Sequence, residues 1–285
     1  MGITLPCGHE AVTTDQAHYC SYLRLHELLQ LQPTGDQTRH PDEHLFVSTH
    51  QAFEIWFKQL LFDMQRLIAA LDRDNTGLAT WLTRRITRIT ALFTPMIQIL
   101  DTMAPSDFFT FRPYLSPASG TESQQFRAIE ILAGLRDPAY RHFLETPIET
   151  DPNGNQTCLW TDWLRTLWES RSLHDAVMDL FRRRGVTPAD IYTSAPLPNP
   201  NADLFLLAEE LLDFDETFAL WRTAHARVAE RAIGPDIPGT SHTTGVRYLD
   251  YTAARSRFFP ELWHARTTLW ERMGDAPHEP ATRRG

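Results

Sequence analysis

Three polar side chains lie in strongly apolar stretches of the sequence. His50 follows Phe46 by four residues and precedes Phe53 by three, so the three fall on one face of a helix. A histidine on such a face is either a core residue whose ring nitrogens find hydrogen-bond partners, or a hydrogen-bonding or acid–base group in a dry aromatic pocket. The residue pattern alone leaves both interpretations open.

His225 has the same character near the other end of the chain. It follows Phe218 and Trp221 and precedes Ala229 and Ala232 on one helix face. Small residues beside a histidine leave room for a flat group, and a neutral imidazole there could ligate haem iron. The alternative is again a buried core histidine.

Arg112 lies in the aromatic stretch FFTFRP at 108–113. A guanidinium cannot be neutralised in a protein, so among aromatic rings it needs an anion. The anion is either the carboxylate of a structural salt bridge or a substrate carboxylate bound by the guanidinium in a bidentate manner. The histidines of HPDEH at 40–44 are spaced like a ligand pair, but Pro41 marks a helix entrance, so we interpret them as solvated or capping residues.

Helices must position these side chains. Apolar residues recur every three or four positions through most of the chain, and no run of alternating strands is evident. The sequence therefore predicts an all-α fold, a helical bundle, with residues 1–17 as a disordered tail and 18–285 as one domain. The predicted helices span 42–72, 78–103 with a kink at Pro95, 121–135 opened by a capping box at Thr121, 159–184, and 201 or 203 to 233.

Composition narrows the class of protein. The chain has 285 residues and a net charge of −9, which disfavours nucleic acids and anionic membranes as partners. No apolar run approaches the ~18 residues of a membrane span, and the first residues do not resemble a secretion signal. Three cysteines, Cys7, Cys20 and Cys158, indicate a reducing compartment, so we expect a cytoplasmic protein. Eight Trp and sixteen Phe indicate either core packing or a flat pocket for an aromatic ligand or macrocycle.

Several separate motifs, in order, resemble the tryptophan 2,3-dioxygenase family. The resemblance runs from about residue 18 to 266, which is nearly the whole chain. The motifs are YCSYLRL at 19–25, DEHLFVSTHQ at 42–51, FR at 111–112 with LSPASG at 115–120, LWRTAH at 220–225, and FFPELW at 258–263.

The resemblance implies a role for each matching residue. His225 would be the proximal ligand of a non-covalent b-type haem, with O2 as co-substrate. His50 would be the catalytic residue, facing the indole N–H from the distal side. Phe46 would pack against the indole, and Arg112 would clamp the carboxylate. Ser119 and Gly120 would line the distal pocket, and Thr240 would meet the ammonium group of the substrate.

The resemblance also implies a homotetramer, built as a dimer of dimers. Tyr19, Tyr22 and Leu23 match positions that complete the pocket of a neighbouring subunit. Three departures from the family pattern surround the substrate: Phe108 stands where a tyrosine is common, Thr121-Glu122 replaces Phe-Gln, and Ser241-His242 replaces two glycines. The last change stiffens a loop after Thr240.

The reaction that the resemblance implies is oxidation of L-tryptophan, or of a ring- or β-substituted tryptophan, by O2 on haem. Cleavage of the C2–C3 bond would give a product of the N-formylkynurenine type. The alternative is a monooxygenase that leaves the ring closed and forms a 2-oxindole from a derivative such as β-methyltryptophan. A haem sensor without turnover is a third reading, which the combination of His50 and Arg112 disfavours.

Overall fold

Long helices form the body of the molecule in the computed structural model, which describes residues 19–115, 122–136, 138–150, 156–193, 199–237, 249 and 257–274. The α-helices are α1 (Tyr19–Tyr22), α2 (Leu25–Leu28), α3 (Pro41–Asp72), α4 (Thr76–Ala91), α5 (Phe93–Gln98), α6 (Pro105–Leu115), α7 (Gln124–Ala133), α8 (Pro138–Glu145), α9 (Asp162–Glu169), α10 (Leu173–Arg184), α11 (Ala202–Ile233) and α13 (Pro260–Gly274). Short 3-10 helices are η1 (Gly35–Gln37), η2 (Ile99–Thr102) and η4 (Asp190–Tyr192). The predicted all-α class is confirmed.

One small element was not predicted from the sequence. Strands β1 (Pro147–Thr150) and β2 (Gln156–Cys158) pair antiparallel in a two-stranded sheet. The sequence PNGN at 152–155, between the strands, predicts a turn, and these residues lie outside the described part of the chain. Each strand is too short to show an alternating pattern, so sequence periodicity could not reveal the hairpin.

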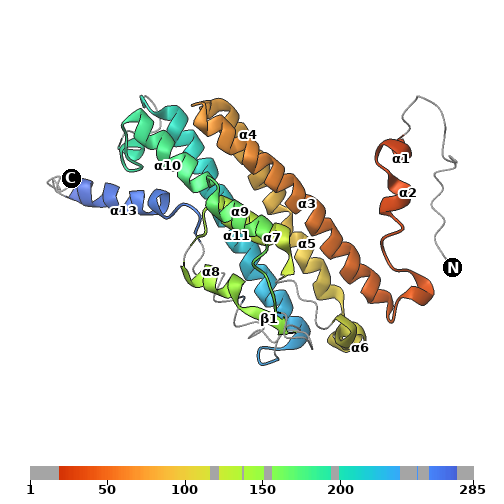
Figure 1. The fold of residues 1–285 in the computed structure, drawn as a ribbon. Coiled ribbons are helices and arrows are strands. Elements are labelled where there is room, and N and C mark those ends of the chain that lie inside the picture. Colours follow the sequence, from red (N-terminus) through yellow and green to blue (C-terminus); the bar gives the residue numbers. More distant parts are fainter. Residues whose placement is uncertain are drawn as a thin grey trace, which may run out of the picture.

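Two 32-residue helices, α3 and α11, form the frame of the bundle (Figure 1). α3 packs against α4, α7 and α10, while α11 packs against α4 and α5. Their bounds agree closely with the predicted helices, because apolar residues recur with the helical period throughout. Residues typical of helix ends also mark the start of α3 and the end of α11. Pro41 opens α3 and Gly234, with φ +83°, ends α11.

Two predicted long helices are interrupted instead. The predicted helix 78–103 is divided into α4, α5 and η2, and the break comes at Leu92 rather than at Pro95. Pro95 occupies the first turn of α5, where a missing N–H costs nothing. The predicted helix 159–184 divides at Ser170–Ser172, where Ser172 and Asp175 form a capping box that starts α10.

Aromatic side chains fill the centre of the bundle between α3, α5, α7 and α11. Ring centroids of neighbouring members lie 5.2 to 6.0 Å apart, which is normal for offset and edge-to-face packing. The cluster consists of Phe53, Phe57, Phe93, Phe126, Phe218 and Trp221. His225 lies beside it, because Trp221 is one helical turn earlier on α11. Much of the aromatic content is therefore core packing around a candidate site.

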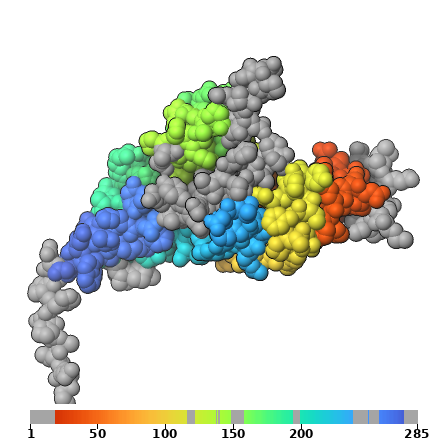
Figure 2. Space-filling view, turned by 90° about the horizontal axis from the view of Figure 1, so that it is seen from below, coloured from red at the N-terminus to blue at the C-terminus, as the bar shows by residue number. Residues whose placement is uncertain are grey.

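The two ends of the described chain leave this bundle. α1 and α2 lie beyond the start of α3, and α13 projects from the opposite end (Figures 1 and 2). Asp215 of α11 attaches the segment before α13, because its carboxylate accepts from the backbone N–H groups of Phe258 and Phe259 and from Trp263 Nε1. None of the described helices is both long and apolar enough to cross a bilayer. The predicted disordered tail, 1–17, lies outside the described residues.

Candidate active site

The first part of the candidate site lies near the start of α3. The rings of Phe46 and His50 are in contact, with centroids 4.1 Å apart and planes tilted by 36°. Nδ1 of His50 lies 2.7 Å from the carbonyl oxygen of Phe46. A carbonyl can only accept, so Nδ1 carries the proton that it donates, and in the neutral ring Nε2 is left as an acceptor.

Burial determines the protonation state of His50. Desolvation lowers the pKa of His50 below its ordinary value of 6.5, although the Phe46 carbonyl and the charge of Glu54 oppose the shift. The imidazole is therefore neutral at pH 7. This agrees with the hydrogen-bonding and acid–base interpretation, since Nε2 of a neutral ring that is protonated at Nδ1 can accept a proton or a hydrogen bond.

α6 supplies an aromatic wall beside Phe46. The rings of Phe108 and Phe111 lie 5.7 and 5.8 Å from that of Phe46, and both are buried. Arg112 is the next residue of α6 and is half-buried. The sequence predicts only a short helical turn here, with Ser106 as its N-cap, whereas α6 is an eleven-residue helix.

His225 forms the second part of the site, on α11. Its imidazole stacks on Trp221 with planes 12° apart and centroids separated by 6.1 Å. Desolvation, with smaller contributions from His50 and Arg127, lowers the pKa of His225 to about 4. The side chain keeps some exposed surface, yet protein surrounds it closely enough for desolvation to dominate. Phe53, three residues after His50, contacts Trp221, four residues before His225, with ring centroids 5.8 Å apart, so the two predicted histidines lie in one region of the interior.

These features fit a haem ligand. Haem iron binds a neutral imidazole, and His225 is neutral at any pH well above 4. Trp221 adds a flat indole beside the ring, and its buried Nε1 has no hydrogen-bond partner among the described residues. A buried donor of this kind is uncommon in a closed protein core. The residues present are therefore compatible with a flat cofactor at His225.

A buried charged cluster, which sequence reasoning missed, joins α7 to α11 next to His225. Glu130 accepts from Arg127 at 2.8 Å, and also from Arg222 and from the hydroxyl of Tyr140. Burial and Glu130 raise the pKa of Tyr140 well above 10, so its hydroxyl stays a donor. The one sequence feature that could have indicated this cluster is the position of Arg222, three residues before His225 in an apolar stretch.

Three of the other predicted site residues, at the start of the described chain, are not brought to this region of the same chain. Tyr19 and Tyr22 are 74% and 78% exposed, and Leu23 is 42% exposed, on the segment beyond the start of α3. Ser119, Gly120 and Thr240 lie outside the described residues, as do Thr121, Ser241 and His242. α7 begins at Gln124 with Ser123 as its cap, so the predicted capping box at Thr121 was wrong.

A His–Asp–Asp group at the start of α3 is a cap. His40, Asp42 and Asp107 offer ligand atoms within 4.8 Å of one another. His40 Nδ1 accepts from the backbone N–H of Asp42 at 3.2 Å, so the neutral ring carries its proton on Nε2. The positive end of the α3 dipole also disfavours a cation. The capping interpretation of His40 is confirmed.

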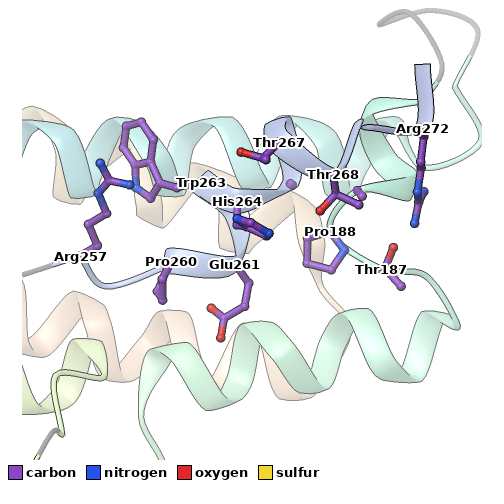
Figure 3. Close-up of a pocket in the computed structure, with 12 residues that line it drawn as sticks. Thr187, Pro188, Arg257, Pro260, Glu261, Trp263, His264, Thr267, Thr268 and Arg272 are labelled. Atoms are coloured by element: carbon purple, nitrogen blue, oxygen red, sulfur yellow. The ribbon is translucent and has the colours of Figure 1, made fainter. Parts of the chain in front are cut away.

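A groove of about 700 Å³ lies between α13 and the segment at 187–189 (Figure 3). Its charged side chains pair with other protein groups: Glu261 with His174 at 2.8 Å, and Arg272 with Asp190 at 2.7 Å. Arg257 lies over the ring of Trp263. Neither His50 nor His225 lines this groove, so it is separate from the candidate site.

Comparisons with known proteins agree with the motif pattern. The family model described as tryptophan 2,3-dioxygenase matches residues 5–159 and 183–269. A Caulobacter vibrioides protein named tryptophan 2,3-dioxygenase is 35% identical over 272 residues, covering 88% of this chain and 98% of its own. Proteins of the same name from Herpetosiphon aurantiacus and a Nocardioides species are 34% and 35% identical, covering 88% and 89% of this chain and 98% and 95% of their own.

Proposed function

The chain belongs to the tryptophan 2,3-dioxygenase family, and we propose that it is a haem-dependent oxygenase acting on the indole C2–C3 bond of L-tryptophan or a substituted tryptophan. One observation carries the proposal. His225, whose imidazole is neutral, lies in the same region of the interior as His50, because Phe53 of α3 contacts Trp221 of α11. Nε2 of His50 carries no proton and can accept a hydrogen bond. The expected product is the ring-opened N-formylkynurenine type.

His225 would hold the haem, a b-type group bound without a covalent link to the chain. A ferrous haem held by one histidine supplies O2 activation, which indole needs because triplet O2 reacts with it poorly. Trp221 would fix the plane of the imidazole through its stacking contact. The remaining work of the protein is to bind and orient the indole.

Residues of α3 and α6 would orient the substrate. His50 would accept the indole N–H at Nε2, because its own proton is held at Nδ1 by the Phe46 carbonyl. Phe46, backed by Phe108 and Phe111, would pack on the ring. Arg112 would bind the carboxylate through a charge-assisted pair. Ser119 and Gly120 would line the pocket, and Thr240 would meet the ammonium group.

We further propose that the chain assembles as a homotetramer in the cytoplasm. Tyr19, Tyr22 and Leu23 are exposed on a segment that stands apart from the bundle (Figure 1), as side chains reaching a neighbouring subunit would be. Apolar groups so exposed gain most by burial against a partner. Sedimentation of the full chain at four times its mass would support the assembly, and a monomer would refute it.

Isotope labelling tests the reaction. The reduced haem protein is incubated with L-tryptophan and, separately, β-methyltryptophan under 18O2, and product mass is measured. We expect two labelled atoms in a ring-opened product, because dioxygenation needs no net reductant. One labelled atom in a closed ring indicates the alternative 2-oxindole monooxygenase, which must also consume two electrons. Haem binding without any product indicates a sensor and refutes both reactions.

The pH dependence of kcat/KM tests the role of His50. We expect kcat/KM to fall in acid with an apparent pKa below 6.5, because protonation turns Nε2 from an acceptor into a donor facing the indole N–H. The lowered pKa keeps the active neutral form present to lower pH. His50→Gln retains an acceptor oxygen that does not titrate in this range, so it should lose the acid limb. An unchanged limb in that variant would contradict the assignment.

A further inference from the structure

α4 and α11 lie side by side and run in the same direction. Thr76 Oγ1 of α4 donates to Asp203 Oδ2 at 3.0 Å, and Arg84 Nε donates to Glu210 Oε1 at 2.7 Å. The partners are 127 positions apart in the first pair and 126 in the second. This nearly constant offset determines which exposed side chains of the two helices are neighbours.

Both helices expose large apolar side chains. Leu78 and Trp81 are exposed on α4, as is Leu92 at its C-cap, and Leu206 and Leu220 are exposed on α11. The offset places Trp81 beside Leu206. It also places Leu92 beside Leu220, so apolar groups cross both helices at two levels. Apolar surface gathered in this way is typical of a protein–protein contact, whereas single exposed apolar residues are common on any surface.

Charged side chains lie between these two apolar groups, and their sign differs between the helices. Arg85 and Arg88 are exposed on α4, whereas Asp213 and Glu216 are exposed on α11. Arg85 pairs with Asp63 of α3 at 3.3 Å. Within the described ranges, Arg88, Asp213 and Glu216 have no ion-pair partner. The four charged residues and the two apolar groups together form the α4–α11 face.

The acidic row of this face is crowded with like charges. Burial raises the pKa of Asp213, and the charges of Glu210, Glu209 and Glu216 raise it further. A cation opposite Asp213 would relieve this repulsion. The basic row on α4 is the complementary group, but it lies beside the acidic row on the same face and both point outward.

The α4–α11 face is complementary to itself. A twofold axis in the plane of contact, parallel to the helices and midway between them, places α4 of each copy on α11 of the other at the same level. Apolar groups then meet apolar groups, and Arg88 meets Asp213 and Glu216 of the second copy. An axis perpendicular to the helices would instead place Arg88 on Arg88, and like charges facing each other oppose association.

We propose that a second copy of the chain docks on the α4–α11 face, with α4 of each copy packed on α11 of the other. A dimer of dimers needs two different twofold contacts. Tyr19, Tyr22 and Leu23 supply one of them in the proposed assembly, and the α4–α11 face supplies the other. The inference rests on the proposed homotetramer, to which it adds this second contact.

Charge reversal tests the pairing across the face. Arg88→Glu reverses the unpaired charge of α4, and the double variant Asp213→Arg/Glu216→Arg reverses those of α11, so copies of either variant repel one another. We expect each assembly to fall to half the wild-type mass, with the dissociation constant of this contact raised on the order of 100-fold. The measurement is sedimentation equilibrium of the haem-loaded full chain, with helix content checked by circular dichroism.

A mixture of the two variants provides the decisive comparison. In a mixed pair, the acidic α4 and α11 of the Arg88→Glu chain meet the basic α11 and α4 of the double variant. We expect an equimolar mixture to recover the wild-type mass, although neither variant does so alone. General damage to the fold could not be reversed by mixing, so recovery would identify the charge pairing itself.

Substitutions of the apolar groups and on a distant helix complete the design. Trp81→Glu places a charge in an apolar group of the face and should also halve the mass. Trp163→Glu is its control, because Trp163 is an exposed tryptophan on α9. Arg165→Glu is the control for charge reversal, since Arg165 is an exposed α9 arginine that pairs with Asp162 at 3.0 Å. Both controls should keep the wild-type mass.

Wild-type mass in a folded Arg88→Glu protein would overturn the proposal, as would failure of the mixture to associate. If Arg88→Glu does not fold, Trp81→Glu and Trp163→Glu make the comparison, and equal masses overturn the proposal. A wild-type dimer refutes the homotetramer on its own. Monomers of Arg88→Glu would then still support the α4–α11 face, and dimers would overturn it. A wild-type monomer overturns both.

Discussion

Replacement of His225 by alanine is expected to give a folded protein that does not retain haem. Its imidazole, neutral and closely surrounded by protein on α11, is the proposed ligand, and alanine offers no atom that can bind iron. Because loss of an outer-shell partner of a metal ligand alone costs about 10–100-fold in affinity or activity, loss of the ligand should cost on the order of 100-fold or more. The measurements are the Soret band and iron content per chain.

A matched variant separates loss of the ligand from general damage. His174→Ala removes another partly buried histidine, one that pairs with Glu261 at 2.8 Å, and it should keep full haem occupancy. Added imidazole should restore part of the Soret band in His225→Ala, since a small ligand can occupy the vacated space. Full occupancy with a wild-type Soret band in His225→Ala would refute the assignment.

The two long helices could be predicted because the residues that determine their bounds lie within or next to each helix. The bounds of α3 and α11 follow from an uninterrupted apolar period and from Pro41 and Gly234. The break before α10 is also marked in the sequence by Ser172 with Asp175, but it lies inside a helical pattern, so apolar periodicity alone extends the helix across it. A three-residue strand has too few positions to show an alternating pattern, so β2 could not be predicted from the sequence.

The candidate site was predicted only in part, for a physical reason. His50 and His225 could be identified because each sits on an apolar face, a pattern that a few neighbouring residues define. The polar contacts near them join two helices that are distant in the sequence. Glu130 and Arg222 are 92 positions apart, and Glu54 and Ser123 are 69 apart, so no spacing rule relates them. The all-helical frame was needed before either contact could be known.

Replacement of Glu130 by alanine is expected to destabilise the protein by about 3–5 kcal/mol, the cost of breaking a buried charge pair. Glu130 is 1% exposed, and Arg127 and Arg222 are 3% and 5% exposed. Both buried guanidiniums would lose a carboxylate contact, and the Tyr140 hydroxyl would lose its acceptor. For a chain of this size the midpoint of thermal unfolding should fall by roughly 10 °C.

The exposed pair Arg141–Glu145 provides the control. Its members have side chains 49% and 40% exposed at i and i+4, so Glu145→Ala should cost no more than about 0.5 kcal/mol. Unfolding of each variant by denaturant, measured with haem absent, gives the comparison. A Glu130→Ala protein within about 1 kcal/mol of wild type would contradict the expectation, which rests on the full burial of the pair.

The same cluster links stability to the proposed haem site. Arg222 lies one helical turn before His225 on α11, and Arg127 lowers the pKa of His225. Replacing Glu130 and Arg222 together by Leu and Met removes the carboxylate and one cation at once, so it should recover part of the lost stability. Haem affinity should recover less, because α7 would no longer be held to α11 through a directional contact. Equal recovery of both properties would show that the cluster supports the fold alone.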